Sequence, residues 1–526
     1  MRDHVIAVDV GTGSARAGVF DQAGALLARC ERPILLYRPR DDRGEHDSEE
    51  IWAASCGAVR DALAESGIDA ARIAAMAFDA TCSLVLRGAD GTQLPLTQTA
   101  SHRFDTIAWL DHRATAEADE CSRTGHKAVL HSGEVMSPEM EIPKLMWLKR
   151  HRPDLWQRAG LFLDLADFLT WKATGSPARS RCTLTAKWTY MAQSDNGWQR
   201  DFLAMVGLED LTERGGLPDE TVPIGAAVGT LSAEAAAAFG LDEGIPVAAG
   251  MVDAYAGALG VLGSSGGNDD SLDGQVAIIG GTSSCIIAFA REPRFGRSLW
   301  GPYYESVFPE HWLVEAGQSA TGGLLNHLLQ IHSATADSSV PRHQQVIARI
   351  LELKAEEGPD FADGINILPD FHGNRSPFAD PHMTGVISGL TLDTSFDGLC
   401  RLYWRACVAI ALGLKQILDT MGQSGYAHER ITLTGGHVKN PLLTQLYADV
   451  TGCPIVLPDV ADAVLLGTAI NAATSAGWHP TLFASGTAMR RGGKVIAPDT
   501  SAASRYERDY KRFLAMQRHR AELSEM

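Results

Sequence analysis

The sequence predicts an α/β protein whose two halves are built alike, and three observations support this. Residues 5–10 are apolar and β-branched, and the chain alternates again after a Gly-rich turn, which predicts a strand hairpin over residues 4–21. The same pattern of strand, Gly-Thr turn and strand returns over residues 275–289. Helical segments separate the other predicted strands, as is typical of α/β proteins.

Length and composition fit an acidic enzyme with more than one domain. With 526 residues the chain is too long for one hydrophobic core, and its content of 45% hydrophobic and 21% charged residues is ordinary. The formal charge of -18 argues against nucleic acid or an anionic membrane as partner, because both attract basic surfaces. The nine scattered cysteines contain no CxxC pair, so we expect no zinc ribbon and no disulfide scaffold.

The same totals indicate where the protein works. An odd number of cysteines, with no secretory leader, fits a reducing cytoplasm. No apolar run approaches the length of a membrane span. We therefore expect a cytoplasmic protein that acts on a small molecule.

Polar residues follow several predicted elements of the first half. Asp79 ends one strand, Trp109 and Asp111 end another, and Asp253 comes directly after a third. Strand ends of this kind collect functional groups in α/β proteins. The expected elements are a helix from Ser48, strands over residues 73–78 and 106–110, helices within residues 112–215, a helix over residues 234–239 and a strand over residues 245–251.

A linker-like segment separates the halves. Residues 263–274, GSSGGNDDSLDG, are small, acidic and without periodicity. We therefore expect one domain over residues 1–262 and a second over residues 263–526. After the second hairpin, the expected elements are helices over residues 321–330, 344–354, 399–421, 441–450, 463–477 and 504–525, and a strand over residues 431–433.

The first Gly-rich turn suits the phosphates of a nucleotide. Gly11 and Gly13 allow backbone N–H groups to approach an anion, and Asp9 could hold a hydrated Mg²⁺. A Walker P-loop is excluded because the turn contains no Lys, and a dinucleotide fingerprint because Arg16 stands at its third glycine. Taken alone, the turn is equally compatible with an ordinary β-hairpin.

Several stretches along nearly the whole chain resemble the FGGY carbohydrate kinases, which are related to actin and hexokinase-like ATPases. The resemblance implies a two-lobed fold with two ribonuclease H-like domains, a cleft that closes over the nucleotide, and ATP and Mg²⁺ as cofactors. The stretches, in family order, are DVGTGSARAGVFD, WLDHRA, PKLMWLK, GMVDAYAGALG, IGGTSSCI, EAGQSATG, LPDFHGNRSPFADPHMTGVISGL, TGGHVKNPLL and LLGTAINAA.

The resemblance also implies roles for single residues. Asp253 is expected to be the general base that orients the sugar hydroxyl and takes its proton, although Asp after a strand also suits a helix N-cap. Asp9 is expected to act on Mg²⁺ through water. The phosphates are expected between Gly11, Thr12 and Gly13 on one side and Gly281, Thr282 and Ser283 on the other, with the adenosine at Gly435, Gly436 and Asn440. Asn440 also suits an N-cap before Pro441.

Within the family, ribulokinase-like members are the most similar. Glycerol kinases have an Arg-Glu pair where this chain has Cys82 and Ser83, which argues against glycerol as substrate. Lys187 and Glu315 match ribulokinase positions that contact the ketose, although a surface Lys or a rim Glu is the usual interpretation of such residues. The expected sugar site is Cys82, Trp109, Asp111, Lys187, Asp253 and Glu315, with Asp79 and Arg113 in support.

We expect phosphorylation of D-ribulose to D-ribulose 5-phosphate, ahead of L-ribulose, D-xylulose, a pentitol such as ribitol, or a tetritol. The alternative of a different class is a non-catalytic or filament-forming relative or a sugar-responsive regulator; a filament protein would not need Trp109, Lys187 and Glu315. Two departures from the family, Glu141 in place of a small or hydroxyl residue and Ala409 in place of an acid or amide, concern fine specificity. A homodimer is also expected.

Overall fold

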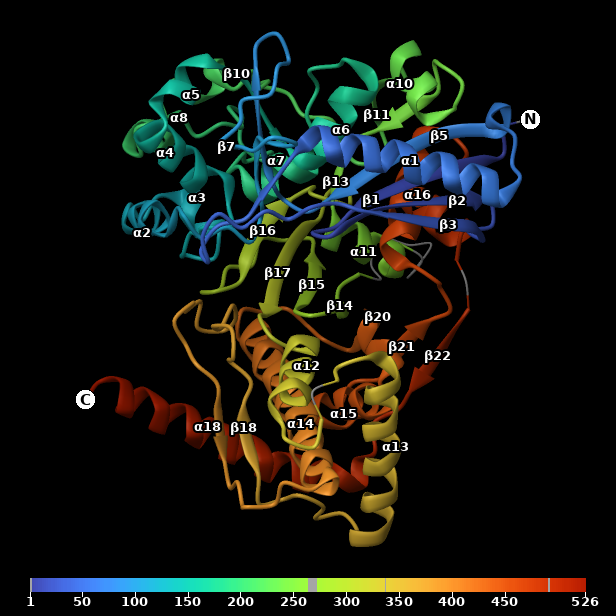
Figure 1. Cartoon of the computed structure of the whole chain (residues 1–526). Coiled ribbons are helices and arrows are strands. Elements are labelled where there is room, and N and C mark those ends of the chain that lie inside the picture. The colour runs from blue at the N-terminus through green and yellow to red at the C-terminus, as the bar shows by residue number, and fades with distance from the viewer. Residues whose placement is uncertain (1, 264–271, 336, 491) are drawn as a thin grey trace.

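The computed structural model describes residues 2–263, 272–335, 337–490 and 492–526, and two seven-stranded sheets organise it (Figure 1). The predicted linker over residues 263–274 lies mostly outside the described residues. The strand order of the first sheet is β11-β12-β5-β1-β2-β3, with β13 beside β5. Its strands are β1 (His4–Val10), β2 (Ser14–Asp21), β3 (Leu26–Pro33), β5 (Ile73–Ala80), β11 (Ala227–Thr230), β12 (Pro246–Ala248) and β13 (Met251–Val252).

The second sheet repeats the plan of the first. Its order is β16-β17-β15-β14-β20-β21-β22. In both sheets the first strand pairs antiparallel with the next strand of the chain and parallel with a later one, β1 with β2 and β5, and β14 with β15 and β20. Both predicted hairpins are therefore confirmed. The strands are β14 (Gln275–Gly280), β15 (Ser284–Ala290), β16 (Trp300–Tyr304), β17 (Trp312–Gln318), β20 (Arg430–Gly435), β21 (Ile455–Pro458) and β22 (Gly493–Ile496).

A smaller four-stranded sheet lies in the first half, in the order β10-β6-β9-β4. The prediction of helices alone over residues 112–215 is wrong at β10 (Ala159–Asp164), whose short apolar run pairs with β6 (Leu84–Gly88). The strand expected over residues 106–110 ends early, because the backbone turns after Ala108 and the N–H of Trp109 donates to Ser83. The other short strands are β4 (Glu45–His46), β9 (Thr106–Ile107), β7 (Thr97–Gln98) with β8 (Arg103–Phe104), and β18 (Asn366–Leu368) with β19 (Val386–Ser388).

Helices cover the sheets. The expected helix from Ser48 is confirmed, with Asp47 as its N-cap. In the first half they are α1 (Ser48–Ser66), α2 (Thr115–Arg123), α3 (Lys127–Leu130), α4 (Glu141–His151), α5 (Pro153–Arg158), α6 (Leu165–Thr174), α7 (Arg181–Lys187), α8 (Arg200–Met205), α9 (Leu211–Arg214), α10 (Ala233–Phe239) and α11 (Asp253–Leu262). In the second half they are α12 (Gly322–Ile331), α13 (Val340–Glu357), α14 (Phe396–Gln423), α15 (Pro441–Thr451), α16 (Ala463–Ser475), α17 (Leu482–Ala488) and α18 (Ala503–Ser524). Among the described residues, no helix is both long and apolar enough to cross a membrane.

Helices α11 and α16 join the two sheets. They lie against each other between the sheets (Figure 1), with α16 packed on β1 and β5 and α11 packed on β14. Leu466 of α16 and Leu482 of α17 accordingly belong to the hydrophobic core of the first sheet. The domain split at residue 262 stays a prediction. The packing of α16 and α17 shows that the chain returns to the first sheet in its C-terminal part.

The contact between these two helices requires glycine. A Cβ at Gly467 would lie 1.8 Å from the carbonyl oxygen of Ala256, and one at Gly260 would lie 2.0 Å from that of Ala463. Because the clashing atoms are backbone, neither side chain could be accommodated without moving a helix.

We therefore expect Gly467→Ala to lower the free energy of unfolding by about 1–3 kcal/mol, as overpacking does. Chemical denaturation followed by circular dichroism measures this. Gly477→Ala is not a suitable control because its φ is positive; Gly364→Ala, where a Cβ meets nothing within 4 Å, is suitable. Equal stability of the Gly467 and Gly364 variants would contradict the close contact.

Candidate active site

The two Gly-rich turns are built alike and present bare backbone. In the first, the N–H of Gly11 donates to the carbonyl of Ser14 at 3.0 Å, and in the second the N–H of Gly281 donates to the carbonyl of Ser283 at 2.8 Å. A Cβ at Gly13 would meet no atom within 4 Å. The backbone at Gly13 therefore faces open space, as a loop that binds phosphate oxygens requires. The phosphate roles of Thr12, Thr282 and their neighbours stay predictions.

The second turn is held from behind by the start of α12. The N–H of Thr321 donates to the carbonyl of Thr282 at 2.9 Å, and that of Gly322 donates to Gly281 at 3.1 Å. A ring nitrogen of His437 lies 3.0 Å from the same Gly281 carbonyl, and burial lowers the pKa of this histidine to about 4. His437 is therefore neutral at pH 7, and it fixes the turn without adding charge.

Gly435 lies opposite Gly280 at the ends of β20 and β14. Its φ is +83°, and a Cβ there would lie 2.3 Å from the Gly280 carbonyl oxygen. Only glycine fits this position, whereas a Cβ at Gly436 would meet only that same oxygen, at 3.7 Å. The adenosine site proposed for these glycines stays a prediction.

Asn440 is the N-cap of α15. Its Oδ1 accepts from the N–H groups of Leu442 at 3.1 Å and Leu443 at 3.3 Å, and its amide nitrogen lies 3.5 Å from the hydroxyl of Tyr403. The N-cap interpretation is confirmed. Its contact with adenine stays a prediction, and the amide is already bound within the protein.

Asp9 pairs with Arg16, which faces it across the first hairpin. The Nη1 of Arg16 lies 3.1 Å from Oδ2 of Asp9, and the two residues are opposite in the strand register. Burial raises the pKa of Asp9 to about 7, Arg16 opposes this, and the carboxylates of Asp462 and Asp253 add to it. The sequence reasoning missed Arg16 as a site residue, although the hairpin register alone could have indicated it.

A magnesium ion fits this position as a water-bridged ligand. Within the described residues, no three His, Cys, Asp or Glu side chains are close enough to hold a metal ion by themselves. Mg²⁺ commonly takes one or two carboxylates and completes its shell with water and phosphate oxygens. Asp9 is the carboxylate that would supply this ligand: its buried Oδ2 makes no hydrogen bond to any described residue, and among these residues its one ion pair is that with Arg16.

Two acids, the predicted supporting residue Asp79 and the predicted sugar-site residue Asp111, are bound by the protein itself. Asp79 is fully buried and accepts from the hydroxyl of Thr468 in α16. Asp111 accepts from Nε of Arg113 at 2.8 Å and from the N–H of Gly44 at 2.8 Å. The part of Asp111 in sugar binding stays a prediction, and in the structure this side chain fixes the loop that follows Trp109.

Asp253 is the first residue of α11, and Val252 takes the N-cap position, so the N-cap interpretation of Asp253 is wrong. Its Oδ1 accepts from the N–H of Ala254 at 2.7 Å. Burial raises the pKa of Asp253 and the carboxylate of Glu315 adds to this, while Arg16 and Lys187 oppose it. Its side chain is partly exposed at the helix start, where it could accept a proton from a bound molecule.

Lys187 and Glu315 meet although 128 residues separate them. The Nζ of Lys187 lies 3.5 Å from Oε2 of Glu315, and the hydroxyl of Tyr255 donates to the same oxygen at 3.0 Å. Both charged residues are buried, so the interpretation as a surface Lys and a rim Glu is wrong. Burial raises the pKa of Glu315, but Lys187 and then Arg375 outweigh it, so the net pKa is lowered.

Trp109 connects the expected sugar wall to the first turn. Its indole Nε1 donates to the hydroxyl of Thr12 at 2.9 Å. Its backbone N–H donates to Ser83 at 3.1 Å, next to the buried Cys82. A change in the position of this ring would therefore be transmitted to the first Gly-rich turn.

Glu141 and Lys144 form a fully buried ion pair in α4. Nζ lies 3.5 Å from Oε1, and both side chains are 0% exposed. Neither carboxylate oxygen nor the ammonium makes a hydrogen bond within the described part of the chain. Burial raises the pKa of Glu141 to about 7, against the effect of Lys144. The sequence indicated Glu141 only as a departure from the family.

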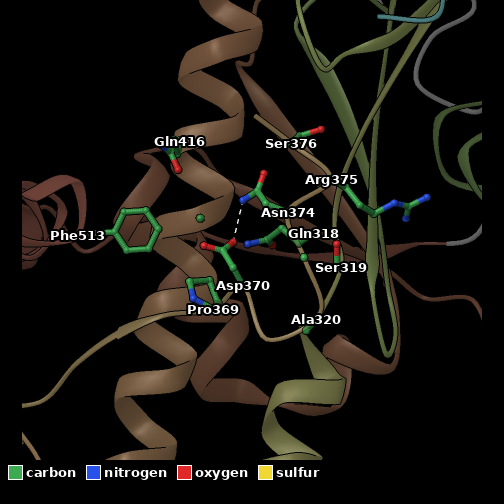
Figure 2. Close-up of a pocket in the computed structure, with 12 residues that line it drawn as sticks. Gln318, Ser319, Ala320, Pro369, Asp370, Asn374, Arg375, Ser376, Gln416 and Phe513 are labelled. Atoms are coloured by element: carbon green, nitrogen blue, oxygen red, sulfur yellow. Dashed lines mark hydrogen bonds between the residues drawn. The ribbon is translucent and has the colours of Figure 1, made fainter. Parts of the chain in front are cut away.

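A pocket lies between the end of β17, the loop over residues 369–376 and α14 (Figure 2). Asp370, Asn374 and Gln318 line it, and Asn374 donates to Asp370 at 2.8 Å. Apart from Arg375, its lining includes none of the residues that surround Asp253. The candidate site therefore rests on the convergence of side chains from both halves and not on this pocket.

These features define a two-domain phosphotransferase with an actin/hexokinase-like ATPase fold. The chain belongs to the FGGY family of carbohydrate kinases: the model of its N-terminal domain matches residues 4–260 and that of its C-terminal domain matches residues 276–476. The fold class predicted from the sequence is confirmed. The protein is thus an enzyme that transfers phosphate to a sugar.

Known relatives cover almost the whole chain. An FGGY carbohydrate kinase domain-containing protein of Homo sapiens is 40% identical over 99% of this chain and 97% of its own length. A D-ribulokinase of Saccharomyces cerevisiae is 36% identical over 88% of this chain and 71% of its own. The crystal structure of xylulose kinase from Rhodospirillum rubrum, 24% identical over 99% of this chain and 100% of that one, has a TM-score of 0.81 and shares the fold.

Proposed function

We propose that this kinase transfers the γ-phosphoryl group of ATP to a pentulose, with D-ribulose as the first candidate and D-ribulose 5-phosphate as the product. The observation that carries the proposal is the buried pair of Lys187 and Glu315 beside Asp253. A charged donor and acceptor suit the hydroxyl and carbonyl groups of a ketose. The similarity to a D-ribulokinase supports the same choice.

In the proposed reaction a sugar hydroxyl attacks the γ-phosphorus in line with the leaving ADP. Asp253 accepts the hydroxyl proton, a P–O bond forms to the sugar, and the bond between the γ-phosphorus and the bridging oxygen breaks. The backbone N–H groups of Thr12 and Gly13 in the first turn, and of Thr282 and Ser283 in the second, stabilise the charge on the phosphates, whereas those of Gly11 and Gly281 donate within the turns. A magnesium ion, when bound through water to Asp9, would offset further negative charge.

Other compounds that could accept the phosphoryl group form the panel that tests the choice of D-ribulose. L-ribulose, D-xylulose, ribitol and a tetritol differ from D-ribulose in stereochemistry, oxidation state or length. Cys82 and Ser83 offer no charged group to the hydroxyls of glycerol. We therefore expect a preference for ketopentoses.

The cytoplasmic location and the homodimer stay predictions.

ADP release coupled to a reporter, measured over this panel and glycerol, tests the function. We expect kcat/KM to be highest for D-ribulose. A higher value for another sugar would overturn the choice of D-ribulose. ATP hydrolysis indifferent to every sugar, together with polymer formation, would instead support a filament-forming ATPase.

Glu315→Gln is expected to raise KM for the sugar about 10- to 100-fold, because hydrogen bonds to charged groups contribute about 1.5–3 kcal/mol. The change also leaves the Lys187 ammonium without its carboxylate. Steady-state kinetics with D-ribulose measures this. Glu310→Gln is the control, since Glu310 pairs with Arg291 at the surface. An unchanged KM in the Glu315 variant would remove this residue from the sugar site.

A further inference from the structure

Arg375 makes an ion pair between the two halves of the chain that the proposed chemistry does not use. It lies in the Pro/Gly-rich loop between β18 and β19, and its Nη2 donates to Oε2 of Glu139 at 3.0 Å. Glu139 lies two residues before α4 in the first half. The two side chains are 13% and 17% exposed, so water and salt screen this pair much less than a pair on the surface.

Indole rings from both halves flank the guanidinium. Its central carbon lies 4.7 Å from the ring centroid of Trp300, in the second half, and 6.0 Å from that of Trp109, in the first. Arginine is attracted to aromatic faces at such distances. The indole of Trp109 also donates to Thr12, so one ring contacts both Arg375 and the first Gly-rich turn.

The same side chain runs beside the strands that carry the second turn. A Cβ at Gly317 in β17 would lie 3.3 Å from Cδ and Nη1 of Arg375. Figure 2 shows the side chain of Arg375 pointing away from Asp370 and Asn374, toward these strands. Its charge also lowers the pKa of Glu315, after the larger effect of Lys187.

Side chains of the two halves therefore contact each other at several positions around the site. Three of these contacts join a residue of the first half to one of the second. They are Glu139 with Arg375, Lys187 with Glu315, and Tyr255 with Glu315. The last two involve residues of the proposed sugar site, whereas neither Arg375 nor Glu139 belongs to the residues proposed to bind the sugar.

We propose that Arg375 is a positioning residue whose ion pair with Glu139 holds the two halves closed, so that Trp109 and Thr12 meet the second phosphate turn in a fixed arrangement. The kinetic consequence rests on the proposed sugar phosphorylation, but the closure itself does not. If only the closed form binds sugar productively, the apparent affinity falls in proportion to the closed fraction. Loss of the pair reduces that fraction.

Small-angle scattering of the ligand-free protein tests the closure directly. We expect a larger radius of gyration for Arg375→Gln and for Glu139→Gln than for the wild-type chain. The double variant is expected to be no more open than either single variant, because both remove the same interaction. Arg349→Gln is the matched control, since Arg349 pairs with Asp397 at 2.8 Å within the second half.

Kinetics provides the second measurement. In Arg375→Gln we expect KM for the sugar to rise about tenfold, while kcat changes less because saturating sugar itself favours the closed form. Arg375→Lys, which keeps the charge, is expected to recover part of the loss. Thermal unfolding by circular dichroism establishes that each variant is folded before either comparison is made.

Three results would overturn the positioning role. The first is an unchanged radius of gyration in Arg375→Gln. The second is an unchanged KM of Arg375→Gln for a sugar on which the wild-type enzyme is active. The third is a radius of gyration that increases further in the double variant, by the sum of the two single effects. If the wild-type enzyme phosphorylates no sugar of the panel, the proposed function fails while the scattering result still decides the role of Arg375. The two proposals are therefore distinguishable.

Discussion

Asp253→Asn is expected to lower kcat for D-ribulose about 10²- to 10⁴-fold, the range that a positioned general base contributes. The amide has the size of the carboxylate but cannot take the hydroxyl proton. ATP binding should be unaffected, because the phosphate turns at Gly11–Gly13 and Gly281–Ser283 are separate segments. Coupled ADP release measures kcat, and calorimetry with a non-hydrolysable ATP analogue measures nucleotide binding.

The control is Asp242→Asn, which changes an exposed carboxylate that pairs with Arg2 at 3.4 Å. It is expected to leave both quantities unchanged. Sugar-dependent turnover at the wild-type rate in Asp253→Asn would remove this residue from the role of base. Loss of ATP binding together with kcat would mean that the variant disturbs the nucleotide site.

The pH dependence provides a further check on Asp253. The base must be ionised, so activity is expected to fall as pH decreases through its pKa, which burial raises above 3.8. Lys187 opposes this rise, so Lys187→Met is expected to move the acid limb of the profile to higher pH. Profiles of kcat/KM for the two enzymes test the direction.

Glu141→Leu is expected to lower the free energy of unfolding by about 3–5 kcal/mol at pH 8, because it leaves the buried ammonium of Lys144 without a partner. The double variant Glu141→Leu with Lys144→Met removes both charges and should recover most of this loss. Chemical denaturation measures all three proteins. A double variant less stable than Glu141→Leu would contradict the buried pair as the cause.

Glu507→Ala is the control for this pair. Glu507 and Lys511 also form an ion pair on one helix, at 3.1 Å, but their side chains are 68% and 74% exposed. Exposed pairs contribute little to stability because water and salt screen them. The variant is therefore expected to unfold like the wild-type protein.

The same carboxyl predicts how stability changes with pH. Folding raises the pKa of Glu141 from 4.5 to about 7, so the folded state holds this proton more tightly than the unfolded state. The protonated carboxyl of Glu141 therefore adds to the free energy of unfolding below pH 4.5, and this contribution is lost as pH rises through 7. Glu141→Leu should lack this part of the dependence.

Much of the fold could be predicted from local patterns. The two hairpins and the positions of their Gly-rich turns follow from alternation and turn residues, which act over a few residues. The helix over residues 399–421 was found within three residues at each end, as α14 (Phe396–Gln423), because a long apolar periodicity is a strong signal. The missed strand β10 is six residues long and lies between helices, where periodicity is weak.

The candidate site was predicted less completely. The resemblance to the family indicated Asp253, Lys187 and Glu315, but the spacing in the sequence gives no reason for their contact. Arg375 and Tyr255 were missed, because nothing in the residues around them marks a partner in the other half. Asp111 was predicted to bind the sugar and Asn440 the adenine; both roles stay predictions, and the structure shows each side chain hydrogen-bonded within the protein.

The sequence by itself determined the repeated hairpin, its two Gly-rich turns and the resemblance to the FGGY family. Each of these depends on residues that are neighbours in the chain. Only the tertiary structure decided that α16 of the second half packs on the first sheet, that Glu141 and Lys144 are fully buried, and that Arg375 pairs with Glu139. Burial and long-range partners depend on how two separately formed sheets pack together. That packing is a property of the whole chain and not of any one segment.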